Sequence, residues 1–259
     1  PTPRLNSSAA SDVYKRQSTD RGKTWKKDPS PDVPKVIQSA IPFGRIISMG
    51  GKKLAYSSYR SKGSGKPSET WLVTSEDDGK SWNKISKFGS NDSNEATLCH
   101  LSDKRVLAAV RTHMDHHVKL CEFSLKNKKR WKEKGPLTLP MQHPADLTHL
   151  SDNCLLLTYG IRNRGLMGIG ARLSIDGGKT WRPPWVIHQF GNEAKDIGYP
   201  STTAVDKEGT LLTAFYTDYE STLKKKPNLY RVLSMRWSLK DWLHPTILGS
   251  ISDGKQLKL

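Results

Sequence analysis

Four short apolar runs recur along the chain, and each is entered through a polar turn. They cover residues 53–59, 105–110, 154–159 and 211–216. A short apolar run that follows turn residues is typical of a buried strand after a hairpin. The pattern therefore predicts an all-β chain in which one hairpin is repeated.

A second repeat has the form Ser-x-Asp-x-Gly-x-Thr/Ser-Trp. Clear copies occupy residues 18–25, 75–82 and 174–181, and a degenerate copy at residues 124–131 keeps only the Ser and the Trp. The copies start at residues 18, 75, 124 and 174, a period of about fifty residues. About fifty residues, with several short strands and one fixed turn, are typical of one four-stranded propeller blade.

The residues of this turn have a structural explanation. Its Asp can accept hydrogen bonds from nearby backbone amides, its Gly supplies a positive φ, and its Trp packs the hairpin against its neighbours. We therefore interpret the Asp as a structural residue and not as a catalytic acid. The motif turns are expected between the third and fourth strands of each blade.

Composition narrows the possible partners. The chain of 259 residues is 35% hydrophobic with a mean hydropathy of −0.64, and it contains no stretch resembling a membrane span. The net charge is +17, but the lysines are scattered, and the densest runs (126–130 and 224–226) fall in predicted turns. We interpret these basic runs as solvated loops and not as a surface that binds a polyanion, and we expect no nucleic-acid partner.

No cofactor and no metal is expected. The three cysteines form no CxxC pair, and the apolar surroundings of Cys99 and Cys154 predict buried free thiols. His113, His116 and His117 could be drawn with Asp115 as a metal site. Consecutive residues of a strand point to opposite faces, however, so ordinary loop histidines are favoured.

The repeated turn resembles the Asp-box of sialidases, and residues 196–201 and 208–216 are similar to bacterial sialidase-like proteins. The resemblance covers roughly residues 18–240. It implies a six-bladed β-propeller that is incomplete here, with about four and a quarter blades. One blade end is followed by blades starting near Pro42, Ala96, Ala145 and Tyr199.

The N-terminal segment is treated separately. Residues 7–17 read SSAASDVYKRQ, which looks like a translated sequencing-adapter tail. We expect residues 1–17 to be non-native and residues 18–259 to be a partial propeller domain. No signal peptide is visible, and a secreted or periplasmic location is implied by the resemblance alone.

Sialic acid carries a carboxylate on its anomeric carbon, which would repel an anionic nucleophile. This rationalises a tyrosine nucleophile with a glutamate base, and arginines that clamp the carboxylate. By resemblance, Tyr199 is the nucleophile, Glu95 its base and Arg111, sixteen residues later, a carboxylate-binding arginine. The family has Tyr-Ser where this chain has Tyr199-Pro200. Arg162 is preferred as the next arginine, with Arg164 close behind.

Other candidates stay open. Arg172 is a third choice for the arginine, and Tyr216 and Tyr219 are weaker nucleophile candidates because they lie at the far end of a strand. The family's first arginine and acid/base aspartate have no match here, since Asp115 and Asp196 fit no motif.

The expected function is exo-α-sialidase activity, with retention of configuration. The enzyme would release terminal sialic acid, or a related acidic sugar, from sialylated glycans. The full-length form is expected to be active and this chain inactive. The alternatives are a non-catalytic carbohydrate-binding propeller and a glycosidase of the same fold acting on another sugar.

Overall fold

The computed structural model describes residues 16–27, 34–35, 40–61, 67–102, 104–126, 130–151, 153–206, 208–224 and 229–241. Residues 1–15 of the predicted N-terminal tail lie outside these ranges. The chain forms two compact units, Pro1–Leu98 and Cys99–Leu259, and each is described by itself.

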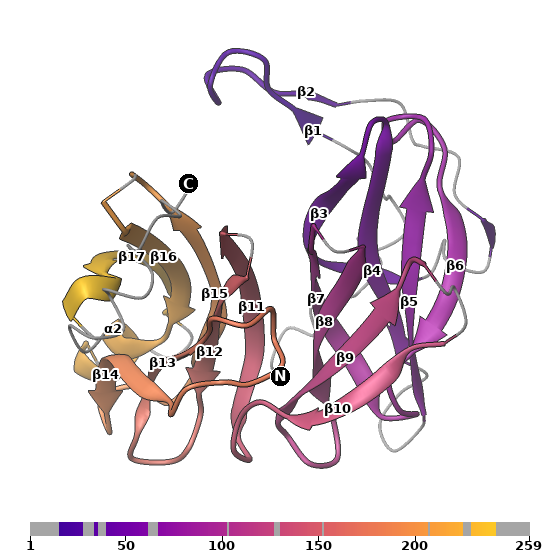
Figure 1. Cartoon of the computed structure of the whole chain (residues 1–259). Helices are drawn as coiled ribbons and strands as arrows, with labels where there is room; N and C mark the ends of the chain where they lie inside the picture. Colours follow the sequence, from indigo (N-terminus) through magenta and orange to yellow (C-terminus); the bar gives the residue numbers. More distant parts are fainter. Residues whose placement is uncertain are drawn as a thin grey trace. The chain divides into compact units, whose positions relative to one another are not determined.

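The described residues are built mainly from antiparallel strands (Figure 1). The first four-stranded sheet has the order β3-β4-β5-β6, with β3 (Ile41–Gly50), β4 (Lys53–Ser61), β5 (Ser68–Ser75) and β6 (Asn83–Phe88). The second contains β7 (Ser93–His100), β8 (Arg105–Thr112), β9 (Val118–Ser124) and β10 (Lys132–Pro136). The third contains β11 (Gln142–Ser151), β12 (Cys154–Ile161), β13 (Met167–Ser174) and β14 (Trp185–Gly191).

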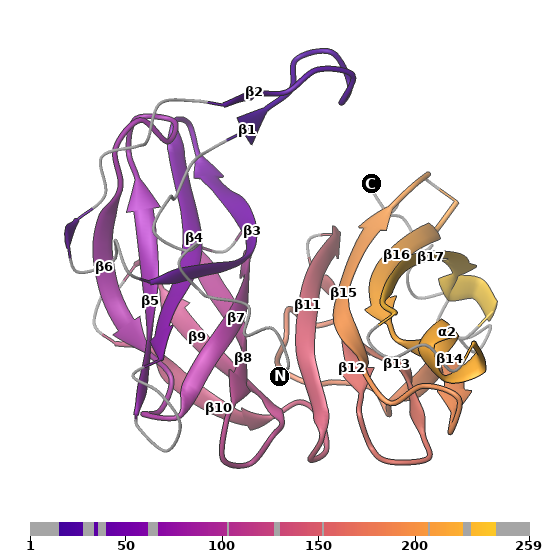
Figure 2. The ribbon, with the colours of Figure 1, turned by 180° about the vertical axis from the view of Figure 1, so that it is seen from behind.

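The last sheet has three strands, β15 (Ile197–Ala204), β16 (Thr210–Thr217) and β17 (Arg231–Ser238) (Figure 2). The helical elements α2 (Tyr219–Leu223) and η2 (Leu239–Asp241) are short. Near the N-terminus, β1 (Arg16–Gln17) pairs with β2 (Lys26–Lys27). The prediction of an all-β propeller is confirmed, and four blades lie within the described residues, each starting close to its predicted position. The additional quarter of a blade stays a prediction. The total of six blades stays a prediction.

Strand β12 explains how neighbouring sheets of the second unit are joined. All of its residues are buried, because its two faces contribute to two separate cores. Leu155 and Leu157 pack with Leu107, Leu120 and other side chains of one cluster. Leu156, from the opposite face of β12, belongs to a second cluster with Ile169, Leu173, Leu211, Phe215 and Trp237. The alternation along one strand therefore packs the third sheet between the second and the fourth.

The motif turns at residues 75–82 and 174–181 lie between the third and fourth strands of their sheets, as predicted, and the turn at residues 18–25 joins β1 to β2. In the turn after β5, the Ser75 hydroxyl donates to Asp77 Oδ1 (2.7 Å), and the amide of Gly79 donates to Ser75 Oγ (2.8 Å). The Ser81 amide also donates to Asp77 Oδ1 (2.9 Å). Matching bonds form in the turns at residues 18–25 and 174–181. The Gly of each turn has φ of 82–83°, which explains the requirement for Gly.

The replacement Asp77→Asn should lower the thermal unfolding midpoint at pH 7. Hydrogen bonds from Ser81 and Ser75 hold the pKa of Asp77 well below its usual value. A carboxyl with a lowered folded-state pKa stabilises the fold above its unfolded pKa, and this contribution is lost as the pH falls through the folded-state pKa. The difference between variant and wild type should therefore shrink below about pH 4. Circular dichroism melts between pH 7 and pH 2 measure it.

Glu76→Gln is the control for this experiment, since Glu76 belongs to the same turn but forms an exposed pair with Lys53. Equal midpoints for Asp77→Asn and Glu76→Gln at pH 7 would contradict the structural role of Asp77.

All three cysteines are free and buried, which confirms the prediction for Cys99 and Cys154. Burial raises the pKa of the Cys154 thiol to about 12, so the thiol is protonated at neutral pH. These thiols are therefore inert core side chains.

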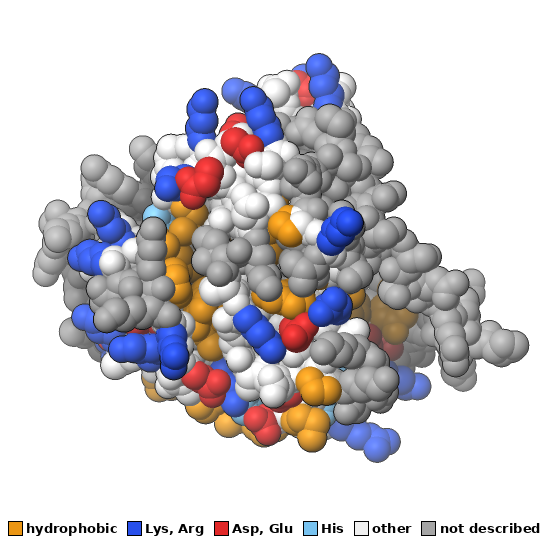
Figure 3. Space-filling model, turned by 90° about the vertical axis from the view of Figure 1, so that its right-hand side faces the viewer, with side chains coloured by type: hydrophobic (Ala, Val, Ile, Leu, Met, Phe, Trp, Pro, Cys, Tyr) orange, Lys and Arg blue, Asp and Glu red, His pale blue; other side chains and the backbone are white. Residues whose placement is uncertain are grey.

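The basic side chains are spread over the surface. On the face shown in Figure 3, basic side chains are interspersed with acidic ones, and several basic side chains lie next to one another near the lower left edge. Several are paired elsewhere in the described chain, such as Arg60 and Lys87 with Glu69. Within the described residues, no helix has the length and apolar character needed to cross a membrane.

Candidate active site

Arg162 follows β12 and is held against the last sheet. Its Nε donates to the carbonyl oxygen of Ile197 (2.8 Å), and its Nη2 donates to the Tyr216 hydroxyl (2.7 Å). The same Nη2 lies 3.5 Å from Asp196 Oδ1. A Cβ at Gly198 would lie 2.8 Å from Nη2, so the glycine leaves room for the guanidinium. Arg162 is therefore fixed in place across two blades.

Tyr199 lies at a β-bulge in the first strand of the last blade. The pairing of β15 with β16 shifts register between Gly198 and Ser201. Tyr199 has φ of 51°, an uncommon conformation for a non-glycine residue, and it is 40% exposed. Its ring centroid lies 6.0 Å from the Arg162 guanidinium carbon. Bulges reorient side chains and are frequent beside active sites, so this geometry is compatible with a role in ligand binding.

Tyr216 is paired with a carboxylate. Its hydroxyl donates to Asp196 Oδ2 (2.9 Å), and its ring centroid lies 5.7 Å from that of Tyr199. Burial raises the pKa of Tyr216, Arg162 opposes this shift, and Asp196 adds to it. Tyr230 completes the group, with its ring edge-on to Tyr216 at 5.7 Å between centroids.

Tyr216 lies at the far end of β16, as the sequence predicted. In an antiparallel pair, the end of the second strand returns to the start of the first, and Gly198 is paired with Tyr216. Tyr216 therefore lies beside Tyr199. Asp196, which fits no motif, precedes β15 and is positioned by Asp218, whose Oδ1 accepts from the Asp196 amide (2.8 Å).

His143 was missed by the sequence analysis. It lies near the start of β11, is only 2% exposed, and neither ring nitrogen has a hydrogen-bond partner among the described residues. Burial lowers the pKa of His143 to about 3, and the next largest causes are the charges of Arg111 and Arg162. Both arginines therefore lie close enough to act on this ring. The available signal was the His143-Pro144 pair, which matches Tyr199-Pro200 in the next blade.

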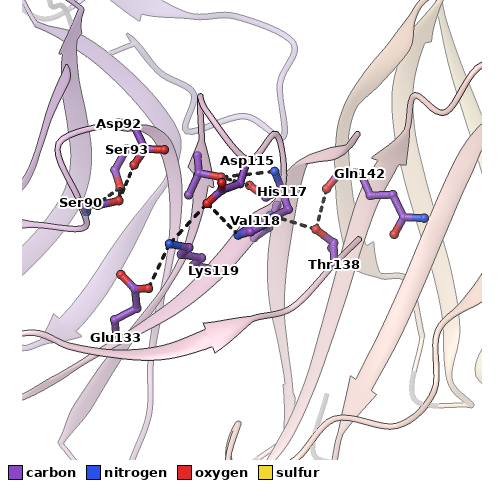
Figure 4. Close-up of polar contacts among 11 residues, drawn as sticks. Ser90, Asp92, Ser93, Asp115, His117, Val118, Lys119, Glu133, Thr138 and Gln142 are labelled. Carbon is purple, nitrogen blue, oxygen red and sulfur yellow. Dashed lines mark hydrogen bonds and ion pairs between the residues drawn. The ribbon is translucent and has the colours of Figure 1, made fainter. Parts of the chain in front are cut away.

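The turn between β8 and β9 carries His113, His116 and His117, the histidines that were considered as a metal site. Figure 4 shows Lys119 between Asp115 and Glu133, at 3.8 and 3.2 Å, while the His117 ring lies 3.9 Å from Asp115. Asp115 is thus part of an exposed group of ion pairs. The described residues contain no group of three or more His, Cys, Asp or Glu side chains arranged to hold a metal ion.

The other predicted residues lie apart from this cluster or remain untested. Glu95 lies in β7, is 6% exposed and belongs to the first unit, so its predicted hydrogen bond with Tyr199 of the second unit stays a prediction. Arg164 is exposed after β12, and no contact within the described part of the chain joins it to Arg162.

Two of the open alternatives have structural roles. Arg172 donates to the carbonyl oxygens of Leu137, Trp181 and Arg182, which identifies it as a structural arginine. Tyr219 packs its ring against Phe190, with 5.0 Å between centroids.

Fold and site together define a β-propeller protein with a cluster of arginine, tyrosine and aspartate side chains at the strand ends of its last two blades. The chain belongs to the BNR repeat-like domain family, whose model matches residues 2–212. No curated protein matches the sequence.

Solved structures share the fold. A protein of unknown function from Dyadobacter fermentans is 22% identical with a TM-score of 0.65, and the match covers 79% of this chain and 59% of that one. A Hadza microbial sialidase is 17% identical with a TM-score of 0.65, over 87% of this chain and 43% of that one. An α-L-arabinanase from Penicillium chrysogenum is 16% identical with a TM-score of 0.56, over 83% and 67%. The chain thus spans less than two thirds of the first two structures.

Proposed function

We propose that this chain is part of a propeller glycosidase that releases a terminal sialic acid, or a related acidic sugar, with retention of configuration. The observation that carries the proposal is the fixed Arg162 guanidinium beside the exposed ring of Tyr199. A guanidinium matches the geometry of a carboxylate, and the bonds that fix Arg162 come from its Nε and Nη2. Arg111, which acts on the same His143 ring, is the second carboxylate-binding candidate.

The proposed reaction has two steps. The Tyr199 oxygen forms a bond to the anomeric carbon while the bond to the leaving oxygen breaks, and Glu95 takes the phenolic proton. A water molecule then attacks the anomeric carbon of the tyrosyl-glycosyl intermediate and loses a proton to the family's acid/base aspartate. The bond from this carbon to the Tyr199 oxygen breaks, and Glu95 returns the proton to that oxygen. The acid that protonates the leaving oxygen corresponds to the family's aspartate, which has no match in this chain.

Tyr216 is the second candidate for the nucleophile. Its hydroxyl donates a hydrogen bond to Asp196 and accepts one from Arg162, so a candidate base and a candidate phenolate stabiliser both contact it. Tyr199 remains the preferred residue because it is the more exposed and lies at the bulge.

Sugar binding by this chain tests the proposal. Isothermal titration with the methyl α-glycoside of N-acetylneuraminic acid, with D-glucuronic acid and with L-arabinose should show binding of an acidic sugar and none of arabinose. The affinity should fall with added salt, because a charge pair is involved. Preferential binding of arabinose would support the alternative of a same-fold glycosidase for a neutral sugar.

Hydrolysis separates an enzyme from a carbohydrate-binding propeller. A fluorogenic sialoside should be cleaved by a protein that also contains the blades expected upstream, and not by this chain alone. Robust cleavage by this chain would show that the catalytic groups are misassigned. Binding without cleavage by the longer protein would favour the non-catalytic alternative.

A further inference from the structure

The first strands of the last two blades begin with the same irregularity. Each contains a bulge. Two residues that are three positions apart on the first strand of the blade are paired with two residues that are only two positions apart on the second strand. The bulges are enclosed by Gly198 and Ser201 in β15 and by Gln142 and Ala145 in β11. His143 in β11 therefore occupies the place that Tyr199 has in β15.

The surroundings of the His143 ring point to an interaction partner other than the protein. The residue is 2% exposed, yet neither ring nitrogen is hydrogen-bonded within the described part of the chain. Buried polar groups are nearly always paired, so two unpaired nitrogens on one ring require an explanation. The exposed side chain of His116 covers the ring, with 5.9 Å between centroids and 27° between planes.

The charge state of His143 restricts what it can bind. With a pKa of about 3, about one molecule in 10⁴ carries the proton at pH 7, so the ring is a poor acid. A neutral imidazole offers one donor and one acceptor. A hydroxyl group also donates and accepts, which makes a sugar hydroxyl the complementary partner, whereas a carboxylate suits the nearby Arg111 and Arg162.

We propose that His143 is a sugar-binding residue whose ring hydrogen-bonds a hydroxyl group of the carbohydrate bound by Arg111 and Arg162, with the His116 ring displaced on binding. This proposal rests on the proposed carbohydrate function. It adds a neutral, hydroxyl-selective contact from the blade before Tyr199.

The test compares His143→Phe with His143→Gln in the whole chain. His143→Phe removes both ring nitrogens and should weaken binding of the preferred sugar at least about tenfold. The sugar hydroxyl would then be buried in the site without its hydrogen-bond partner. Its thermal midpoint should be unchanged or higher, since no unpaired polar atom stays buried. His143→Gln keeps a donor and an acceptor and should bind within about threefold of wild type. His149→Phe, on an exposed position of β11, is the matched control.

A His143→Phe affinity within about twofold of wild type would overturn the proposal. If that variant does not fold, the ring nitrogen signals of His143 in wild type, assigned by their loss in His143→Gln, decide the question by NMR. Their shift on addition of sugar supports the contact, and no shift overturns it. A wild type that binds none of the three sugars overturns the proposed function as well, whereas sugar binding that is insensitive to His143 overturns this inference alone.

Discussion

Tyr199→Phe should lower sialoside hydrolysis by on the order of 10³-fold, within the range that loss of one catalytic group produces. Phe keeps the ring beside Arg162 and removes only the oxygen that is proposed to attack the anomeric carbon. The variant should therefore bind the sugar with nearly unchanged affinity. Initial rates with a fluorogenic sialoside, in the longer protein proposed above, measure the first effect, and titration measures the second.

Tyr216→Phe is the matched comparison. It removes the hydroxyl that joins Arg162 to Asp196, so a loss of about tenfold is expected, mainly through weaker positioning of the arginine. The opposite order, with Tyr216→Phe the more severe change, would reassign the nucleophile to Tyr216 with Asp196 as its base. Circular dichroism spectra of both variants exclude a loss of fold as the cause.

Arg162→Ala should weaken binding of the acidic sugar by roughly 10- to 150-fold, the equivalent of about 1.5–3 kcal/mol for a charge-assisted hydrogen bond. Arg162→Lys should recover little of this loss. The lysine side chain ends in a single nitrogen. This nitrogen cannot donate to the Ile197 carbonyl and the Tyr216 hydroxyl and also bind a ligand in the geometry of the guanidinium. Titration with the sugar that wild type prefers measures both variants.

Arg164→Ala is the control for Arg162, since it removes an exposed arginine two positions later in the same turn. It should leave the affinity unchanged apart from a small, salt-dependent effect. A larger loss for Arg164→Ala than for Arg162→Ala would show that the substrate carboxylate binds at the turn instead of at the strand ends.

The fold was largely readable from the sequence because its two repeats are local. The apolar runs became β4, β8, β12 and β16, and the turn residues fell between third and fourth strands. The apolar run at residues 154–159 explains why both faces of β12 are buried in cores. The sequence did not indicate which leucine faces which neighbouring sheet.

The candidate site was only partly predictable. Two of the predicted residues, Arg162 and Tyr199, lie close together, because both occupy strand ends that the repeat defines, and their roles stay predictions. Asp196 was considered only as an acid that fits no motif, and His143 was missed. The contacts of Asp196 join two blades, and the place of His143 depends on a register shift that the hydrophobic pattern does not encode. The predicted pairing of Glu95 with Tyr199 joins two units and stays a prediction.

The motif turns have a consequence for the order of folding. Their side-chain hydrogen bonds to the Ser and the Asp join residues two to four apart, so each turn closes with little loss of chain entropy. The turn closes whether or not its Trp is buried. Trp25 is 60% exposed and Trp82 is 3% exposed, and in both turns the indole nitrogen donates to the carbonyl oxygen of the motif glycine. Such turns can form before any sheet is complete and nucleate the outer hairpin of each blade, leaving the slower inner strands to assemble afterwards.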